Sequence, residues 1–262
     1  MGSLDGRVAI VTGAGSVGSG VGNGRAIAVL LARQGARLGL IDSQAEPAAE
    51  TARLVEREGG AAVVHLADVG DATGCHDAVD AVTGAFGGLH ILVNNVGITG
   101  ARGTAVDVDP DGWDEVMRVN VKSIMLMAKF AVPEITASGG GAIVNIASIA
   151  GLRGGHPSLA YPTSKGAVVN MTRAMASHHA GAAIRVNCVA PGLIHTPRVE
   201  ARGGGEVREA RRLAAPLKTE GTAWDVAEAV LYLVSDASRW ITGQILTVDA
   251  GLLSTSGAVG AH

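Results

Sequence analysis

Short apolar runs alternate with longer helix-like segments along nearly the whole chain, and this alternation restricts the possible folds more than any other feature. Most of the short runs are continuously apolar, as expected of β-strands that are buried on both faces. The predicted strands are Arg7–Thr12, Arg37–Asp42, Ala61–Leu66, Ile91–Asn94, Ala142–Ile146, Arg185–Ala190 and Ile245–Val248. The predicted helices are Gly24–Gln34, Pro47–Glu58, Thr73–Phe86, Gly112–Ala137, Tyr161–His179 and Ala223–Val234.

Repeated strand–helix–strand units favour right-handed crossovers and therefore a parallel sheet. We predict an α/β fold, a Rossmann-like doubly wound sheet of seven mostly parallel strands flanked by helices on both faces. Pro47 suits a first helical position, and Thr222 with Asp225 resembles a capping box. Because no break in composition divides the chain, residues 1–262 are expected to form one domain.

The charge pattern argues against two classes of partner. The formal net charge of the 262 residues is -3, and no run is rich in lysine and arginine, so neither nucleic acid nor an anionic membrane is an expected partner. No apolar run approaches the roughly 18–20 residues that span a bilayer. The N-terminus also lacks the pattern of a secretion signal. We expect a cytoplasmic protein.

Cysteine and histidine positions give no sign of a metal site. Cys75 and Cys188 lie far apart in sequence and are expected to be reduced thiols. His178 and His179 point to different sides of a helix, with no further ligands nearby. His156 and His195 either contact substrate or are ordinary surface residues. We predict no metal.

Six glycines lie between Val11 and Ala28, where a predicted strand leads into a predicted helix. Glycine lets a backbone approach a diphosphate, and the helix N-terminus offers free N–H donors. The next strand ends at Asp42, where a carboxylate can accept hydrogen bonds from an adenosine ribose. Asp42 would repel a 2′-phosphate, which favours NAD over NADP. The alternative for Asp42 is a helix N-cap.

A tyrosine and a lysine in "YPTSK" are spaced for one chemical task. Tyr161 and Lys165 are four residues apart in a helical pattern, so both project from one face. A nearby ammonium favours the phenolate and lowers the tyrosine pKa from about 10 towards the working pH of an acid–base catalyst. Taken alone, such a pair is more often an ordinary surface pair.

Together these motifs resemble the short-chain dehydrogenase/reductase family, in the single-domain branch whose chains have roughly this length. The resemblance covers about residues 4–251. The family usually has T-G-x-x-x-G-x-G after the first strand. Thr12 and Gly13 match, and the closing pair falls at Gly22 and Gly24 in a loop about five residues longer than usual. A second register would use Gly18 and Gly20.

The resemblance implies two further catalytic residues. Ser148, just beyond the fifth predicted strand, would hydrogen-bond the substrate carbonyl or hydroxyl, although it could merely form a turn. Asn120 would distort its helix and hold a water that links Lys165 to solvent; its alternative is a core asparagine with satisfied hydrogen bonds. The implied catalytic set is Asn120, Ser148, Tyr161 and Lys165.

The resemblance also implies where the cofactor binds. Asp68 and Val69 would lie against adenine, "NNVG" would end the fourth strand, and "VAPGLIHTP" would pass beside the nicotinamide. The implied cofactor contacts are Gly13, Ser16, Gly22, Asn23, Gly24, Asp42, Asp68, Val69, Asn95, Gly97, Tyr161, Lys165, Pro191, Gly192, Ile194 and Thr196.

These features predict an NAD-dependent oxidoreductase that interconverts a secondary alcohol and a ketone, with Tyr161 as general acid/base. The alternatives are an NADPH-dependent 3-oxoacyl reductase and a non-catalytic dinucleotide-binding sensor. The irregular stretch 193–222 is expected to form a substrate-binding loop or lid, and its charged half could form a short solvated helix. A homotetramer is expected by resemblance, and the sequence does not identify the substrate.

Overall fold

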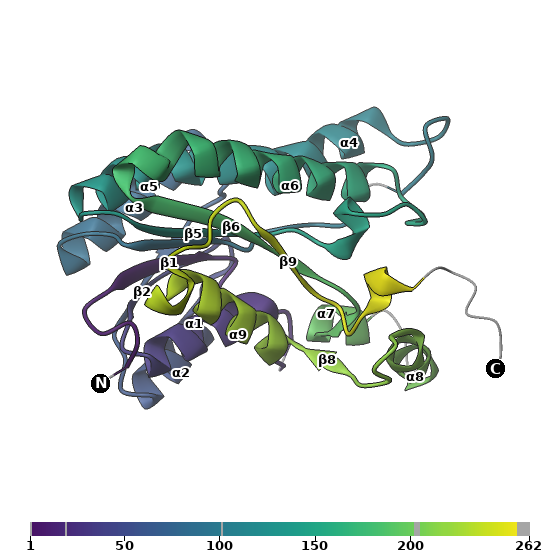
Figure 1. The fold of residues 1–262 in the computed structure, drawn as a ribbon, viewed down its shortest axis with the longest axis horizontal. Coiled ribbons are helices and arrows are strands. Elements are labelled where there is room, and N and C mark those ends of the chain that lie inside the picture. Colours follow the sequence, from purple (N-terminus) through teal and green to yellow (C-terminus); the bar gives the residue numbers. More distant parts are fainter. Residues whose placement is uncertain (1, 19, 101, 202–204, 256–262) are drawn as a thin grey trace.

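A seven-stranded parallel sheet forms the centre of the protein, as a computed structural model describes it for residues 2–18, 20–100, 102–201 and 205–255 (Figure 1). The strand order is β3-β2-β1-β4-β5-β6-β9, and every neighbouring pair is parallel. The strands are β1 (Val8–Thr12), β2 (Arg37–Asp42), β3 (Ala62–Leu66), β4 (Ile91–Asn94), β5 (Gly141–Ile146), β6 (Ile184–Pro191) and β9 (Ile245–Val248). The predicted α/β fold class is therefore confirmed.

The strand order reverses direction beside β1. The chain runs outward from β1 to β3 and then returns to place β4 on the other side of β1. In an open parallel sheet, such a reversal leaves a crevice outside the carboxyl ends of the strands, where ligands bind. The loops that follow β1, β4, β5 and β6 all leave the sheet at this edge.

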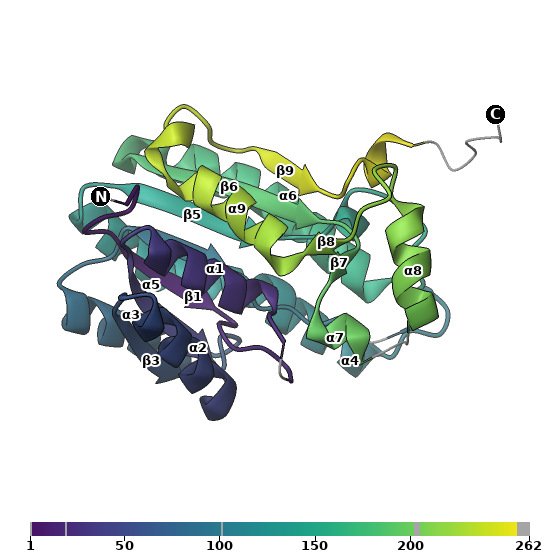
Figure 2. The same cartoon turned by 90° about the horizontal axis from the view of Figure 1, so that it is seen from below.

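Helices cover both faces of the sheet (Figures 1 and 2). One layer contains α1 (Asn23–Arg33), α2 (Ala45–Arg57) and α9 (Ala223–Val234). The other contains α3 (Ala72–Phe86), α5 (Ser123–Ala137) and α6 (Ala160–His179). Alternate residues of β1 belong to the two apolar cores, which explains why the strand sequence is apolar throughout.

Two helix predictions need correction. Pro47 is the third residue of α2 and not the first, because the helix begins at Ala45 after Gln44. Proline is tolerated there because the N–H groups of a first helical turn have no partner within the helix. The predicted helix Gly112–Ala137 is interrupted: α4 (Pro110–Met117) is followed by a π-helical turn, Arg118–Lys122, and then by α5.

Residues 193–222 contain more regular structure than the sequence pattern indicates. Strands β7 (Ile194–His195) and β8 (Gly221–Thr222) pair in parallel and enclose α7 (Pro197–Glu200) and α8 (Gly205–Ala214). Both views place α7 and α8 together at one end of the molecule. The predicted short charged helix is confirmed as α8, and the capping box of Thr222 and Asp225 starts α9.

Candidate active site

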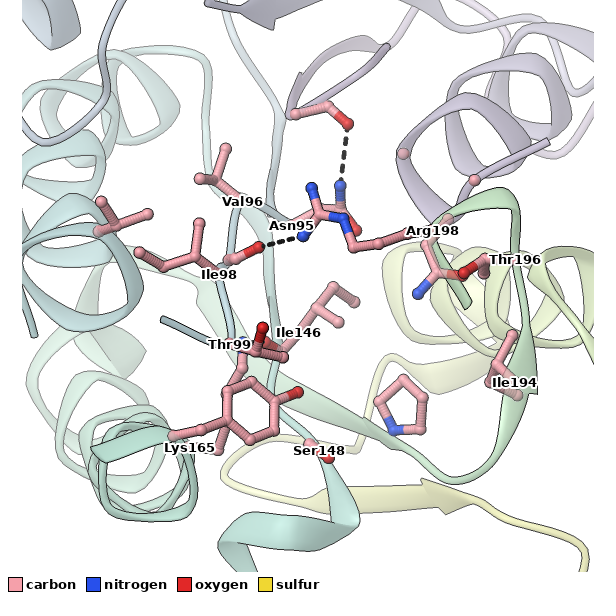
Figure 3. Close-up of a pocket in the computed structure, with 18 of the residues that line it drawn as sticks. Asn95, Val96, Ile98, Thr99, Ile146, Ser148, Lys165, Ile194, Thr196 and Arg198 are labelled. Atoms are coloured by element: carbon pink, nitrogen blue, oxygen red, sulfur yellow. Dashed lines mark hydrogen bonds between the residues drawn. The ribbon is translucent and has the colours of Figure 1, made fainter. Parts of the chain in front are cut away.

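A cleft of about 1070 Å³ lies at the carboxyl ends of the strands (Figure 3). Every residue that the resemblance assigns to the cofactor lines this cleft, and so does Ser148. Asn120 is fully buried and does not line it. One continuous space therefore joins the ends of the first strands to the helix that carries Tyr161 and Lys165.

The glycine loop closes in the register of Gly22 and Gly24. Helix α1 begins at Asn23 with Gly22 as its N-cap. A Cβ on Gly24 would lie 1.9 Å from the carbonyl oxygen of Gly13, so α1 approaches the end of β1 more closely than any side chain allows. The backbone of Gly13 adopts a left-handed φ of 61°, which also favours glycine.

A buried arginine anchors the residues that lengthen this loop. Arg25 donates through Nη1 to the carbonyl of Gly20 at 2.9 Å and through Nε to Thr51 Oγ1 at 3.1 Å. Gly20 in turn lies against Pro197 of α7, where a Cβ would come within 2.3 Å of the proline ring. No role for Arg25 was predicted from the sequence, although an arginine within an otherwise apolar helix indicates that its side chain has partners.

Two buried polar atoms at the start of α1 have no hydrogen-bond partner among the described residues: Ser16 Oγ and Asn23 Oδ1. Buried polar groups are normally paired, and an exception calls for a ligand or a solvent molecule. Both residues line the cleft beside the free N–H groups and the positive end of α1. A serine hydroxyl at this position can donate to a phosphate oxygen, so the cradle fits a dinucleotide diphosphate.

Asp42 lies at the end of β2 with its carboxylate at the cleft. Its Oδ2 accepts from the Gly15 N–H at 2.8 Å, and its Oδ1 accepts from the Gln44 N–H at 3.0 Å. The N-cap of α2 is Gln44, so the helix-cap alternative for Asp42 is wrong. Each carboxylate oxygen retains a further lone pair that a ribose hydroxyl could use.

Arg118 places a cation beside Asp68, where the resemblance implies adenine, and no role for it was predicted from the sequence. Its Nη1 donates to Asp68 Oδ2 at 2.8 Å, and its Nε donates to Glu115 Oε2 at 2.6 Å. Burial would raise the pKa of the Asp68 carboxyl, but the Gly70 N–H and the Arg118 guanidinium hold it below its usual value. Asp68 is thus fixed beside Val69 as an ion-paired carboxylate.

The side chain of Asn95 is used within the protein. Its Nδ2 donates to the carbonyls of Thr12 and Gly13, both at 3.0 Å, and so ties the end of β4 to the glycine loop. Figure 3 shows one of these contacts as the dashed line from Asn95. The expected cofactor contact of Asn95 would therefore come from its backbone.

Lys165 lies in the interior beside Tyr161. Its Nζ donates to the Ile146 carbonyl at 2.9 Å and lies 5.9 Å from the centre of the Tyr161 ring. Burial, opposed by Cys188 and assisted by the positive charge of Arg198, lowers the pKa of Lys165 to about 8. At neutral pH the side chain therefore remains mostly an ammonium beside the phenol.

Ser148 both starts a turn and faces the cleft. Its Oγ accepts from the Ala150 N–H at 3.1 Å, which caps the 3₁₀ turn Ile149–Gly151. The hydroxyl hydrogen is not used by that bond, so it can donate to a substrate oxygen. Figure 3 shows Ser148 and Lys165 on the same side of the cavity. The turn and the catalytic assignments of Ser148 are compatible.

Asn120 lies in the π-helical turn and has several hydrogen bonds. It accepts from the Ile98 N–H at 2.8 Å, and its Nδ2 donates to the Ile98 carbonyl and to Ser164 Oγ, both at 2.9 Å. A Cβ on Gly97 would lie 3.1 Å from Lys165 Nζ and 3.4 Å from Asn120 Oδ1. Asn120 and Lys165 therefore lie against the same wall of the cleft, behind Gly97.

Arg198 reaches across the cleft from α7. Its Nη1 donates to the carbonyl of Gly97 at 2.8 Å, the dashed contact beside Ile98 in Figure 3. His156 lines the same end, with its ring 5.1 Å from that of Tyr161. His195 lies 3.9 Å from Glu200 on the substrate loop and does not line the cleft.

Neither a metal site nor a membrane-spanning helix was found within the described residues. No group of three or more histidine, cysteine or acidic side chains is placed to hold a metal ion there. None of the helices in that part of the chain is both long enough and apolar enough to cross a membrane. Cys75 and Cys188 are buried free thiols, as expected.

Comparisons with known proteins show which proteins the chain is similar to. Residues 18–253 match the model of the family described as Enoyl-(Acyl carrier protein) reductase. The chain is 40% identical over 247 residues to 2-(R)-hydroxypropyl-CoM dehydrogenase of Xanthobacter autotrophicus, covering 93% of this chain and 97% of that protein. It is 38% identical over 245 residues to cis-4-hydroxycyclohexanecarboxylate dehydrogenase of Sinomonas cyclohexanicum, covering 94% and 96%.

A solved structure is also similar. The crystal structure of a protein from Burkholderia xenovorans, described as a short-chain dehydrogenase/reductase, superposes with a TM-score of 0.92 at 38% identity. The match covers 98% of this chain and 100% of that one.

Proposed function

Because this chain belongs to the short-chain dehydrogenase/reductase family, whose members bind nicotinamide dinucleotides and act on CH–OH groups, we propose that it is an NAD-dependent enzyme interconverting a secondary alcohol and a ketone. The observation that carries the proposal is the position of Lys165 beside Tyr161 at one end of a cleft whose other end contains the Asp42 carboxylate. The two similar dehydrogenases are each named after a compound that carries a hydroxyl group, which is consistent with an alcohol substrate for this chain.

The preference for NAD rests on Asp42. A fixed carboxylate accepts hydrogen bonds from the two ribose hydroxyls and repels a 2′-phosphate. Gly15 and Gln44 hold its two oxygens in place through their N–H groups. The Asp42 carboxylate therefore disfavours the alternative of an NADPH-dependent 3-oxoacyl reductase.

The catalytic steps follow from the chain's own groups. Ser148 donates a hydrogen bond to the substrate oxygen and fixes its position. Tyr161 removes the hydroxyl proton during oxidation and returns it during reduction, because the Lys165 ammonium lowers the tyrosine pKa. When bound, the nicotinamide accepts or supplies the hydride. Both N–H groups of the Asn120 amide are used within the protein, so Asn120 would hold the water that carries the proton from Lys165 to solvent through the lone pair of Oδ1 that the Ile98 N–H leaves free.

Fluorescence and absorbance measurements test this proposal. Titration of the protein with NADH and with NADPH, followed by the fluorescence of the reduced nicotinamide, should give the tighter binding for NADH. A panel of secondary alcohols and ketones should then show turnover by a change in nicotinamide absorbance. Binding without turnover across the panel would favour the sensor alternative.

The assembly proposal rests on an exposed apolar patch. Met125 is 45% exposed and lies near Met117, Val121 and Met171, which line a shallow depression among α4, α5 and α6. We propose a homotetramer, as the resemblance implies, in which this face is buried between copies. Light scattering of the purified protein, with and without the change Met125→Asp, checks it.

A further inference from the structure

Charged side chains are separated by sign along the cleft. The acidic residues among its described lining are Asp42, Asp68 and Glu115, and all three lie at the adenosine end, where Arg118 pairs with two of them. The other end is lined by Arg153, Arg198, Arg211, His156 and Lys165, and none of its described lining residues is acidic. The end that holds Tyr161 and Ser148 is therefore strongly cationic.

Arg211 differs from the two other arginines of α8 that flank it. Arg208 pairs with Glu220, and Arg212 pairs with Glu209, both on the outer surface. Arg211 instead lines the cleft, and its one hydrogen bond to a described residue is a 3.3 Å contact with the Ile194 carbonyl. No described carboxylate forms an ion pair with it. Arg211 is partly buried, and this burial lowers the pKa of its guanidinium.

An arginine with five N–H donors and one long backbone contact retains most of its capacity to bind an anion. The diphosphate of the cofactor already has a cradle at the start of α1, formed by Ser16 and the free N–H groups. Arg211 lies in α8, and its contact Ile194 belongs to the segment expected beside the nicotinamide. Because the nicotinamide ring carries no anionic group, an anion held there would belong to the substrate.

We propose that the substrate of this site is a secondary alcohol, or the matching ketone, that carries a carboxylate or sulfonate, and that Arg211 binds this anionic group. The inference rests on the proposed redox function and names its substrate class. Arg198 and Arg153 add to the positive potential that attracts the anion into the cleft.

The test compares acids with their neutral methyl esters, so that the reacting hydroxyl is unchanged. The carboxylate probes are 3-hydroxybutanoate and 4-hydroxycyclohexanecarboxylate, each with its methyl ester. The sulfonate probe is 3-hydroxybutane-1-sulfonate, compared with the neutral methyl sulfone of the same carbon chain because a methyl sulfonate ester would alkylate the protein. We expect wild type to prefer the acids, and Arg211→Met to lower kcat/KM for the best acid about 10- to 100-fold, mainly through KM, because a charge-assisted hydrogen bond is lost. The effect on the matching ester should stay within about twofold, and Arg211→Lys should recover part of the loss.

Two controls separate anion binding from other effects. Arg208→Met changes the same residue type on the same helix outside the cleft, and it should leave the acid-to-ester ratio unchanged. The affinity for NADH, measured by fluorescence, should be the same in Arg211→Met and wild type. An equal loss of activity on acid and ester, or a loss of NADH affinity that accounts for the whole effect, would overturn the inference.

A binding measurement distinguishes failure of the inference from failure of the proposed function. If neither the acids nor their neutral analogues are turned over, the proposed redox function fails for these compounds. Binding of the acids to the NADH complex, detected as a change in NADH fluorescence and lost in Arg211→Met, would still support anion binding. Absence of that binding in wild type would overturn it.

Discussion

Lys165 donates a 2.9 Å hydrogen bond to the Ile146 carbonyl and thereby holds its ammonium 5.9 Å from the Tyr161 ring centre. Ile146 is the last residue of β5, so the end of a central strand determines where the cation lies. Because Lys165 is one helical turn after Tyr161, α6 and β5 together position the charge that the phenol needs.

The change Tyr161→Phe removes the proposed acid–base group and little else. We expect kcat to fall by at least the ~10²–10⁴-fold attributed to such a group. The affinity for NADH should change little, since only one hydroxyl is lost. Steady-state kinetics and a fluorescence titration check both values, and near-normal turnover would refute the role of Tyr161.

Lys165 should give the apoprotein a characteristic dependence of stability on pH. Burial lowers its pKa from 10.5 to about 8, so between these values the unfolded chain binds more protons than the folded one. The free energy of unfolding should therefore rise with pH across this window, by on the order of 2–3 kcal/mol.

Urea titrations at several pH values measure the free energy of unfolding and check this rise. The variant Lys165→Met is the reference, because it has no lysine to titrate at this position. Both proteins should carry Tyr161→Phe, so that ionisation of the phenol does not contribute. Parallel pH profiles for the two proteins would show that Lys165 keeps an ordinary pKa.

The change Gly24→Ala should disturb the glycine loop. A Cβ at this position would lie 1.9 Å from the Gly13 oxygen, so α1 and the loop must move apart. We expect NADH affinity to fall by more than about tenfold, because misplacing a group that holds the diphosphate loses charge-assisted hydrogen bonds. Gly84→Ala is the matched control in α3, where an added Cβ meets nothing; it should bind NADH normally and gain roughly 0.5–1 kcal/mol of stability.

The change Arg25→Met should release the lengthened part of the loop. The carbonyl of Gly20 and the hydroxyl of Thr51 would each lose a donor, at a cost of about 1–3 kcal/mol in the free energy of unfolding. NADH should also bind more weakly, because the loop loses its anchor beside the cradle. Arg33→Met on the same helix removes an exposed ion pair with Glu58, so chemical unfolding should show a change of about 1 kcal/mol or less.

The change Asp42→Ala should alter the cofactor preference. It removes the carboxylate that would bind the ribose hydroxyls and repel a 2′-phosphate, so the affinity for NADH should fall by about 10-fold or more while that for NADPH falls less or rises. Paired fluorescence titrations give the ratio. An unchanged ratio would mean that Asp42 serves only to fix the turn through Gly15 and Gln44.

The strands were predictable because each is apolar on both faces, and their observed ends lie within a residue or so of those expected. The apolar pattern did not show the π-helical turn at Asn120, since the side-chain contacts that accompany it come from Ile98, 22 positions away in sequence. The resemblance did imply a distorted helix at Asn120, and the π-helical turn confirms it. The apolar pattern also missed β7 and β8, which are too short to show a period.

Site residues were predictable where a motif requires a particular backbone geometry, as at Gly24. They were less predictable where a side chain pairs with a residue far away in sequence. Arg118 pairs with Asp68 across fifty positions of the chain, and Arg25 with Gly20 around a bend. Neither pairing leaves a periodic trace. The resemblance to a family likewise gave no weight to Arg211, because it lies in the loop that the motifs do not cover.

Gly20 of the longer glycine loop touches Pro197 at the beginning of α7. The glycine loop and the substrate loop therefore share a contact in this protein, although they are far apart in sequence. Replacing the substrate loop with that of another dehydrogenase, while the longer glycine loop after Ser16 is kept, would remove the partner of Gly20. A redesign of substrate specificity should therefore replace both loops together.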